Sequence, residues 1–251
     1  MNSRKRSASV VERDSMILPL ICKLKQEHPF WGYRRICATL KYKHGIVVNH
    51  KRMLRLLKEH NLLVNRKEYK AKRTGSRPKP KPTRPNEWWG IDMTKVMTGT
   101  GWAYLVIVLD WYTKKIVGYS CETQSRSKEW LEALDMGLNR QFPEGGRNQG
   151  LRLMSDNGCQ PTSVRFMSEC NILGVEQAFT SYNNPKGNAD TERMMRTIKE
   201  ELVWINEFAD IWEFKKALKD WIDSYNSDYL HSALGWMTPE QFEENTLLVS
   251  A

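Results

Sequence analysis

Hydrophobic positions in the first quarter of the chain follow a helical spacing. From about Val10 to Val64, apolar residues recur three or four positions apart, as Ile36, Cys37 and Leu40 do, and this spacing is typical of amphipathic helices. We predict three short helices here. Pro19 falls inside the first apolar pattern and must start, kink or split that helix, because proline lacks an amide hydrogen and clashes with the preceding turn.

The third of these helices is predicted to begin near Asn49, a residue that suits the N-cap position. It would bury Met53, Leu56 and Leu57. Two short helices and a turn containing Gly45, followed by a basic helix, indicate a helix-turn-helix unit in residues 1–64. The alternative is an ordinary small bundle with charged outer faces. The side chains expected to point outward from the third helix are Lys51, Arg52, Arg55 and Lys58.

The next segment, residues 65–85, has no hydrophobic periodicity and is strongly basic. Its "RPKPKPTRP" run alternates proline with charge, which should hold the chain extended as a linker that could lie along a phosphate backbone. A spacer that only solvates is the alternative. Glu68 is its one acid, against Arg66, Lys67, Lys70, Lys72, Arg73, Arg77, Lys79, Lys81 and Arg84.

From residue 86 onward the pattern changes to strands. Three apolar runs, "WWGIDMT", "GWAYLVIVLDWYT" and "KIVGYSCET", lie close enough in sequence to form an antiparallel meander. Helical and strand patterns then alternate, which predicts an α/β fold with a mixed sheet flanked by helices. We expect this domain to span residues 86–228 and a C-terminal tail to span 229–251.

Several carboxylates interrupt these apolar patterns. Asp92 lies inside the first strand, on the same face as Gly90 and Thr94, and a buried carboxylate there needs a partner or a cation. Asp156 ends the strand "LRLMSD" before a sharp turn, where capping that turn is the alternative role. Asp110 also ends a strand and is a rival metal position.

Four further acids lie on the helix that follows Asn188, its expected N-cap: Asp190, Glu192, Glu200 and Glu201. Helix geometry lets only one of them join Asp92 and Asp156 at one metal. Glu192 shares a face with Arg196 and Lys199 at i, i+4 and i+7. An acid followed by two cations suits a metal and phosphate site, although an ordinary i,i+4 ion pair would show the same spacing.

Composition adds a class of partner. Lys and Arg outnumber Asp and Glu by 39 to 29, a net charge of +10, so a polyanion such as nucleic acid is the expected partner, with a solvated basic surface as the alternative. The five cysteines form no CxxC pair, as expected of reduced thiols. No apolar run is long enough to span a membrane, so we expect a soluble protein of the cytoplasm with no membrane partner.

Several longer motifs resemble one known family. The segments "EWWGIDMT", "YLVIVLDWYTKKIVGY", "SDNG", "SYNNPKGNADTERMMRTIKEE" and "SYNSDYLHSALGWMTPEQF", in this order, are similar to the second-frame transposase of the insertion-sequence-three family, within the retroviral-integrase superfamily. The N-terminal "HPFWGYRRICATLKYKHGIVVNHKRMLRLLKEHNLLV" resembles that family's helix-turn-helix segment. The 35 residues between Asp156 and Glu192 match the spacing of the superfamily's Asp, Asp, 35, Glu signature.

The resemblance implies a ribonuclease-H-like catalytic core and a divalent-metal site. Asp92, Asp156 and Glu192 are implied to be the catalytic ligands of Mg²⁺ or Mn²⁺. Arg196 and Lys199 are implied to contact the DNA end. Two departures from related patterns concern Asp190, which stands where many members have alanine, and the zinc-binding His/Cys module of retroviral integrases, which is missing. The DNA contacts expected on the third helix are Lys51, Arg52 and Arg55.

The resemblance also implies an activity and partners. We expect a Mg-dependent DNA transposase that cleaves insertion-sequence ends and transfers a 3′-hydroxyl to a phosphodiester. Its partners would be double-stranded DNA, an upstream-frame protein or fusion, and further copies of the chain, at the bacterial nucleoid. The alternatives are a non-catalytic DNA-binding regulator and a metal-dependent nuclease of the same fold, which would cut without joining.

Overall fold

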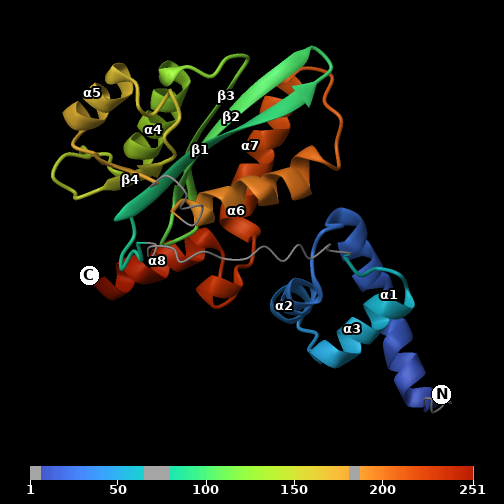
Figure 1. Cartoon of the computed structure of the whole chain (residues 1–251). Coiled ribbons are helices and arrows are strands. Elements are labelled where there is room, and N and C mark those ends of the chain that lie inside the picture. Colours follow the sequence, from blue (N-terminus) through green and yellow to red (C-terminus); the bar gives the residue numbers. More distant parts are fainter. Residues whose placement is uncertain (1–6, 65–79, 181–186, 251) are drawn as a thin grey trace, which may run out of the picture. The chain divides into compact units, whose positions relative to one another are not determined.

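The computed structural model describes residues 7–64, 80–180 and 187–250 (Figure 1). The chain divides into two compact units, Met1–Lys72 and Arg73–Ala251. Most of the predicted basic linker, residues 65–79, lies outside the described residues, so its extended form stays a prediction. The predicted domain boundaries likewise stay predictions.

Three helices form the described part of the N-terminal unit: α1 (Ala8–Glu27), α2 (Tyr33–His44) and α3 (His50–Glu59). The first is longer than the short helix that the sequence predicts. It continues through Pro19 rather than starting or splitting there. The fully buried Ile21 follows Pro19 by two residues, and burial of the apolar face holds the helix across the missing hydrogen bond.

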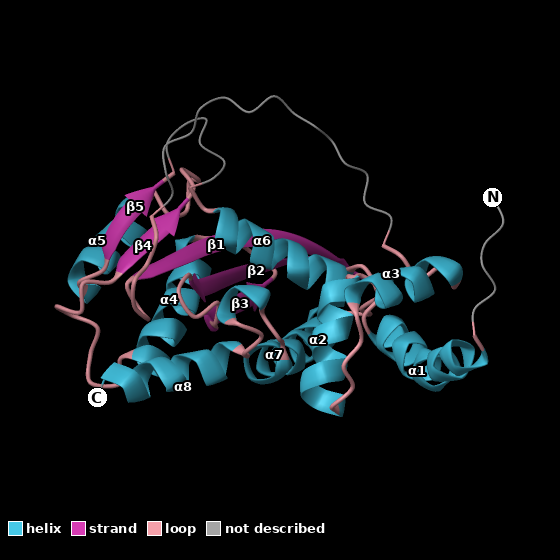
Figure 2. Ribbon diagram, turned by 90° about the horizontal axis from the view of Figure 1, so that it is seen from below, coloured by secondary structure: helices cyan, strands magenta, loops and turns pink. Residues whose placement is uncertain are grey.

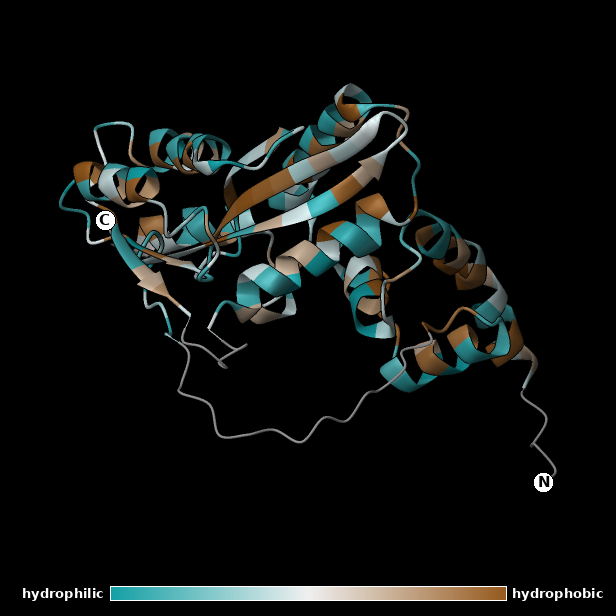
Figure 3. Ribbon diagram, turned by 45° about the horizontal axis from the view of Figure 1, so that its top comes forward, coloured by the Kyte–Doolittle hydropathy of each residue, from teal (hydrophilic) through white to brown (hydrophobic). Residues whose placement is uncertain are grey.

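The start and the buried face of α3 are as predicted. The Asn49 side chain caps the helix by accepting a hydrogen bond of 2.8 Å from the amide of Lys51. Met53, Leu56 and Leu57 are buried in the core of the unit. Figure 3 shows that each helix of this unit carries a hydrophobic stripe beside a hydrophilic one, the pattern expected of a small bundle.

Four cations of α3 were predicted to point outward, and two of them, Arg52 and Arg55, instead bind an acid of α1. Asp14 of α1 is only 7% exposed. Its carboxylate accepts a hydrogen bond of 2.7 Å from Arg52 Nε and one of 2.6 Å from Arg55 Nη2. A buried carboxylate is stable when it is paired in this way. Lys51 and Lys58 remain exposed.

A five-stranded sheet in the order β3-β2-β1-β4-β5 forms the centre of the C-terminal unit (Figure 2). Adjacent strands in the β1–β2–β3 meander are antiparallel, whereas β4 runs parallel to β1 and β5 runs parallel to β4. The predicted meander and mixed sheet are therefore confirmed. The strands are β1 (Trp88–Thr98), β2 (Gly101–Asp110), β3 (Ile116–Glu122), β4 (Arg152–Ser155) and β5 (Glu176–Phe179).

Alternation along β1 separates two faces of the sheet. Ile91 and the partly buried Met93 pack into the hydrophobic core with residues of α4 (Ser127–Gln141) and α5 (Val164–Leu173). The core side chains on these two helices include Trp130, Ala133, Leu134, Leu138, Phe166 and Cys170. Positions 90, 92 and 94 of β1 belong to the opposite face.

That opposite face is covered by α6 (Ala189–Ile198), with α7 (Ile211–Asp228) nearby, and a π-helix, η1 (Lys199–Val203), directly follows α6. The approach of α6 to β1 requires glycine at position 90. A Cβ atom on Gly90 would lie 1.9 Å from Thr191 Oγ1. The helix and the strand are thus in direct contact at this point.

The expected C-terminal tail contains a helix, α8 (Pro239–Ser250), after a short 3-10 helix, η2 (Ser232–Leu234). Thr238 and Gln241 cap its start through two reciprocal hydrogen bonds of 3.2 Å, an arrangement whose sequence signal is a hydroxyl followed three residues later by Glu or Gln. Helix α8 packs against α7. Among the described helices, none is both long and apolar enough to cross a membrane.

Candidate active site

Asp92 lies in the middle of β1, on the sheet face that α6 covers. Its carboxylate is partly buried, and Oδ1 accepts a hydrogen bond of 2.8 Å from the amide of Met93. Its backbone is fixed on one side by pairing with Ile107 of β2. The strand therefore holds this acid in place while its other oxygen remains available to a ligand.

Asp156 immediately follows β4, the parallel neighbour of β1. Gly90 pairs with Met154 in this parallel register. Asp92 and Asp156 each follow one of these two residues by two positions. The exposed Asp156 carboxylate accepts a hydrogen bond of 3.0 Å from the amide of Gly158, so it caps the turn as the alternative interpretation expects. One oxygen of the carboxylate takes this bond, which leaves the second for another partner.

Glu192 lies in the first turn of α6, where its side chain is exposed. The i,i+4 ion pair that was an alternative for this residue does not form: Arg196 Nε lies 2.8 Å from Glu200 Oε1 instead. Within the described parts of the chain, the Glu192 carboxylate makes no hydrogen bond or ion pair. Its carboxylate therefore remains available to a ligand.

The other three acids of this segment have protein partners. Asp190 Oδ2 lies 3.0 Å from Lys114 Nζ. Glu200 pairs with Arg196, and Glu201 accepts a hydrogen bond of 2.7 Å from the Tyr229 hydroxyl. These contacts place the three acids in structural roles.

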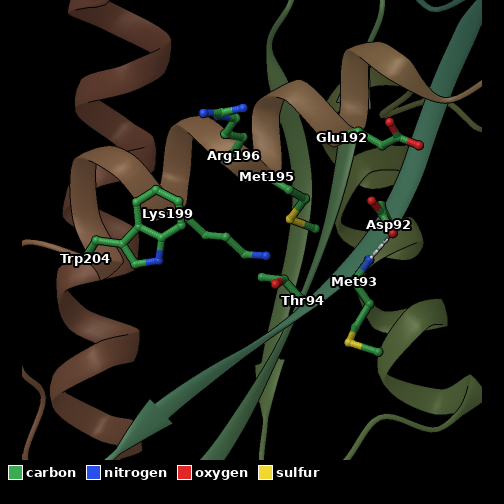
Figure 4. Close-up of a pocket in the computed structure, with 8 residues that line it drawn as sticks. All are labelled: Asp92, Met93, Thr94, Glu192, Met195, Arg196, Lys199 and Trp204. Carbon is green, nitrogen blue, oxygen red and sulfur yellow. Dashed lines mark hydrogen bonds between the residues drawn. The ribbon is translucent and has the colours of Figure 1, made fainter. Parts of the chain in front are cut away.

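Asp92 and Glu192 line one pocket of about 480 Å³, together with the two cations that share the Glu192 face, Arg196 and Lys199. Figure 4 shows the carboxyl groups of Asp92 and Glu192 directed toward one another across the gap between β1 and α6. Asp156 is not among the residues that line this pocket. The remaining lining residues are Met93, Thr94, Met195 and Trp204.

The charge balance of this pocket favours a cation. The pKa of Asp92 is raised to about 6, mainly by burial and also by the negative charges of Asp156 and Glu192, although the amide of Met93 and the charge of Lys199 oppose this shift. Partial loss of water around the exposed Glu192 side chain also raises its pKa. A cation beside Asp92 would offset both its burial and the negative charges of the two neighbouring acids.

Asp110, the rival metal position, is fully buried, and its carboxylate binds backbone amides. Its two oxygens accept hydrogen bonds from the amides of Asn86, Tyr112 and Thr113. Burial nevertheless raises its pKa to about 6. Because the carboxylate fixes a turn inside the protein, Asp110 is not available as a metal ligand.

Comparison with protein families assigns both units. The integrase core domain matches residues 82–185, a second integrase core domain model matches residues 173–239, and an HTH-like domain matches residues 12–70. The insertion element IS600 uncharacterized 31 kDa protein of Shigella sonnei is 30% identical, over 85% of this chain and 81% of its own length. The chain belongs to the insertion-sequence transposases. The transposase for insertion sequence element IS904 of Lactococcus lactis subsp. lactis (strain IL1403) is 29% identical, over 96% of this chain and 98% of its own.

Solved structures agree on the fold of the transposase. The HTLV-2 integrase catalytic core domain in complex with magnesium matches 65% of this chain and 99% of its own, with a TM-score of 0.50 and 15% identity. The predicted family, the ribonuclease-H-like fold behind a helical HTH-like domain and the transposase function are thus confirmed. Polynucleotidyl transfer is the reaction class that this membership implies.

Side chains alone form no complete metal site in the part of the transposase that the structure describes. In the described residues, no group of three or more His, Cys, Asp or Glu is arranged to hold a metal ion. The oxygen donors of Asp92 and Glu192 nevertheless suit a hard divalent cation. Mg²⁺ usually binds through one or two carboxylates together with substrate phosphates and water rather than in an all-protein cage. These donors therefore fit a metal ion whose remaining ligands would be DNA phosphates and water.

Helix α6 starts after the predicted N-cap residue, Asn188, but not through a side-chain cap. Asn188 occupies the N-cap position, but its side chain makes no capping hydrogen bond. Its Nδ2 instead donates a hydrogen bond of 3.2 Å to the carbonyl of Ile91. Because Ile91 precedes Asp92 on β1, this bond fixes the start of α6 beside the strand that carries the first acid.

Four residues of the pocket were not anticipated from the sequence as part of the site: Met93, Thr94, Met195 and Trp204. Thr94 could have been found from strand alternation, because it shares a face with Asp92. Met195 lies three positions after Glu192, so helical spacing places it near the same face. Trp204 carried no usable signal, since regular α-helical geometry would place residue 204 about 120 degrees around the helix from Glu192.

Proposed function

We propose that this transposase cleaves the DNA ends of its insertion sequence and joins a 3′-hydroxyl to another phosphodiester at a site formed by Asp92, Asp156 and Glu192. The observation that carries the proposal is the pocket in which Asp92 of β1 and Glu192 of α6 face one another. Asp156 follows the strand beside Asp92, and its charge contributes to the raised pKa of Asp92.

We propose Mg²⁺, or Mn²⁺, as the cation of this site. Divalent cations in such sites activate an attacking oxygen and stabilise a leaving oxygen in phosphodiester chemistry. Asp92 and Glu192 would hold the cation from two sides of the pocket, and Asp156 would contribute its second oxygen. The apolar side chain of Met195 lines the same pocket and would limit the number of water molecules around the acids.

The cations of the pocket are proposed to hold the DNA backbone. Lys199 and Arg196 line the same pocket as the acids. An ammonium group binds phosphate as a point charge, and a guanidinium can bind it with two donors. Arg196 would exchange its exposed i,i+4 pair with Glu200, which is weak in water, for a phosphate.

The partners of the site are proposed to be element-end DNA, target DNA and further copies of the chain. Each chain carries one proposed site, whereas joining both ends of an element requires two transfer reactions. We therefore propose that at least two copies act together on DNA. An upstream-frame protein, or a fusion with it, is a further proposed partner.

Replacement of Glu192 by Gln tests the site. Gln keeps the size of the side chain but removes the charge, so Glu192→Gln should lower cleavage and joining of labelled element ends in Mg²⁺ to background while DNA binding persists. Glu207→Gln is the matched control, because Glu207 is an exposed acid beyond η1 that lies outside the pocket. It should retain activity.

The products of the same assay separate the alternatives. Cleavage without any joined product would indicate a nuclease of the same fold. Binding without either product, even with the upstream-frame partner supplied, would indicate a non-catalytic regulator. Full activity of Glu192→Gln would contradict the proposed site and would mean that another residue is the third metal ligand.

A further inference from the structure

Trp204 lines the proposed active-site pocket at the end away from the acids. In Figure 4 its indole ring stands at one end of the pocket, Asp92 and Glu192 stand at the other, and the Lys199 side chain extends between them. The Trp204 side chain is 58% exposed. A large aromatic group that remains in water at the edge of a charged pocket suggests contact with a ligand.

The π-helix η1 explains why Trp204 reaches the pocket. The amide of Trp204 donates a hydrogen bond of 2.8 Å to the carbonyl of Lys199, five residues earlier. Such a turn contains an additional residue and rotates the following side chains relative to an α-helix, and π-turns are frequent at functional sites. Leu202 of the same turn is buried, which anchors the turn while Trp204 lies at the surface.

Exposure alone does not distinguish Trp204, because Trp102 and Trp212 are 50% and 71% exposed. The distinction lies in its neighbours. Of these three tryptophans, Trp204 is the one that shares a pocket with the two cations and with the acids. An aromatic ring beside cations that can hold the backbone is the combination that binds single-stranded nucleic acid: bases stack on the ring while phosphates contact the cations.

We propose that Trp204 stacks on an unpaired nucleobase next to the scissile phosphodiester and so positions the DNA end. This inference rests on the proposed function, which places the phosphodiester at the acids. The base must be unpaired or frayed, because the faces of paired bases inside a duplex are already covered by their neighbours. Trp204 is thus a positioning residue, and Lys199 would hold the phosphate between the stacked base and the acids.

The test combines DNA lesions with substitutions in the full-length chain. Element-end DNA carries 2-aminopurine, or an abasic site, at each position flanking the scissile phosphodiester in turn, and the Glu192→Gln background keeps the DNA uncut. Stacking on the indole should quench 2-aminopurine at one position. Trp204→Ala should abolish that quenching, whereas Trp204→Phe should retain part of the affinity.

Affinity on the two kinds of DNA gives an independent readout. Trp204→Ala should weaken binding of intact ends about 10-fold, since a stacked base contributes on the order of this factor. On DNA that is abasic at the stacked position, Trp204→Ala should have no further effect. Trp212→Ala is the matched control, because Trp212 is exposed on α7 outside the pocket, and it should change neither readout.

Two results would overturn the inference: an equal loss of affinity on intact and abasic DNA at every position, or no position at which quenching depends on Trp204. Failure of the proposed function would give a different result, because the Glu192→Gln variant would then still cut and join DNA. The stacking readouts do not require cleavage, so position-dependent stacking could be found even if the catalytic assignment were wrong.

Discussion

The acids of the C-terminal unit differ in what surrounds each carboxylate. Asp110 and Asp92 both have a pKa raised to about 6, mainly by burial. Asp110 is enclosed by three backbone amides, whereas Asp92 faces a pocket. A similar pKa therefore accompanies two different roles, and the contacts of each carboxylate separate the structural acid from the proposed ligand.

Asp110 should make the stability of the fold depend on pH. Its pKa is 3.8 ordinarily and about 6 in the folded chain, so the folded chain binds the proton more tightly than the unfolded chain. The free energy of unfolding should then fall as pH rises from about 4 to about 6, by about 3 kcal/mol for this group. Asp110→Asn should remove this part of the fall, as measured by urea unfolding across that pH range.

Asp92 contributes a fall of similar size, so the Asp110→Asn variant should keep about half of the pH dependence. Asp135→Asn is the control, because Asp135 is exposed on α4, and it should leave the dependence as it is. An unchanged pH dependence in Asp110→Asn would show that the buried carboxylate is not the group that titrates.

At the scale of elements, α3 is attached to α1 through Asp14. Burial opposes ionisation of Asp14, but hydrogen bonds from Arg55 and Arg52 outweigh that effect and lower its pKa. Asp14→Asn should therefore loosen α3. We expect a loss of about 2 kcal/mol, because charged hydrogen bonds contribute this much and the arginines are 26% and 29% exposed, which weakens the pairs relative to fully buried ones.

Hydrogen exchange measures this loss within the full chain. Amides of α3 should exchange about 30-fold faster in Asp14→Asn, the factor that corresponds to 2 kcal/mol. Amides of the sheet should be unaffected. Glu12→Gln, an exposed acid on α1, serves as the control. Unchanged protection of α3 would show that the pairs with Asp14 do not stabilise this helix.

The contact between β1 and α6 gives a second prediction at this scale. Gly90→Ala would place a methyl group where Thr191 Oγ1 and Trp111 Nε1 now lie, at 1.9 and 2.4 Å. Overpacking of this kind costs about 1 to 3 kcal/mol, and displacement of α6 would also move Glu192 away from Asp92. We expect lower thermal stability and a loss of strand joining.

Gly32→Ala is the matched substitution for that experiment. No atom lies within 4 Å of a Cβ at Gly32, and its φ of −80° suits any residue. It should preserve both stability and joining. Normal joining by Gly90→Ala would show that the active site tolerates movement of α6.

Hydrophobic spacing predicted most helices and strands, but not the pairing and packing between elements that are distant in sequence. The meander and the face that Asp92 shares with Thr94 follow from alternation along short strands. The parallel pairing of β1 with β4 does not, because the paired residues Trp88 and Arg152 are far apart in the sequence and local pattern carries no register. Glu192 was selected among its neighbours by helix geometry and the family motif, whereas Trp204 depends on a π-turn that no periodicity signals.

At the scale of the whole molecule, positive charge is concentrated in one segment. Residues 65–85 contain nine cations and one acid, so they carry eight of the ten net positive charges of the chain. The other 230 residues are close to neutral. Long-range attraction to DNA should therefore depend mainly on this segment.

Replacement of the nine cations of residues 65–85 by Gln should change the salt dependence of DNA binding. Each phosphate contact adds about 0.9 to the slope of log affinity against log salt, so the slope should become shallower by up to about 8. Lys128→Gln together with Lys219→Gln, two exposed lysines of the catalytic unit, should change it far less. An unchanged slope after the nine replacements would mean that this segment does not contact the backbone.

Asp92 and Glu192, which face one another in the pocket, are far apart in the sequence and so are translated at different times. Asp92 is made 100 residues before Glu192, and the pocket between β1 and α6 cannot exist until both are present. At translation rates of about 5 to 20 residues per second, this delay lasts about 5 to 20 s. A nascent chain would thus have its HTH-like domain well before it had a complete cutting site, and a chain terminated early could occupy DNA without breaking it.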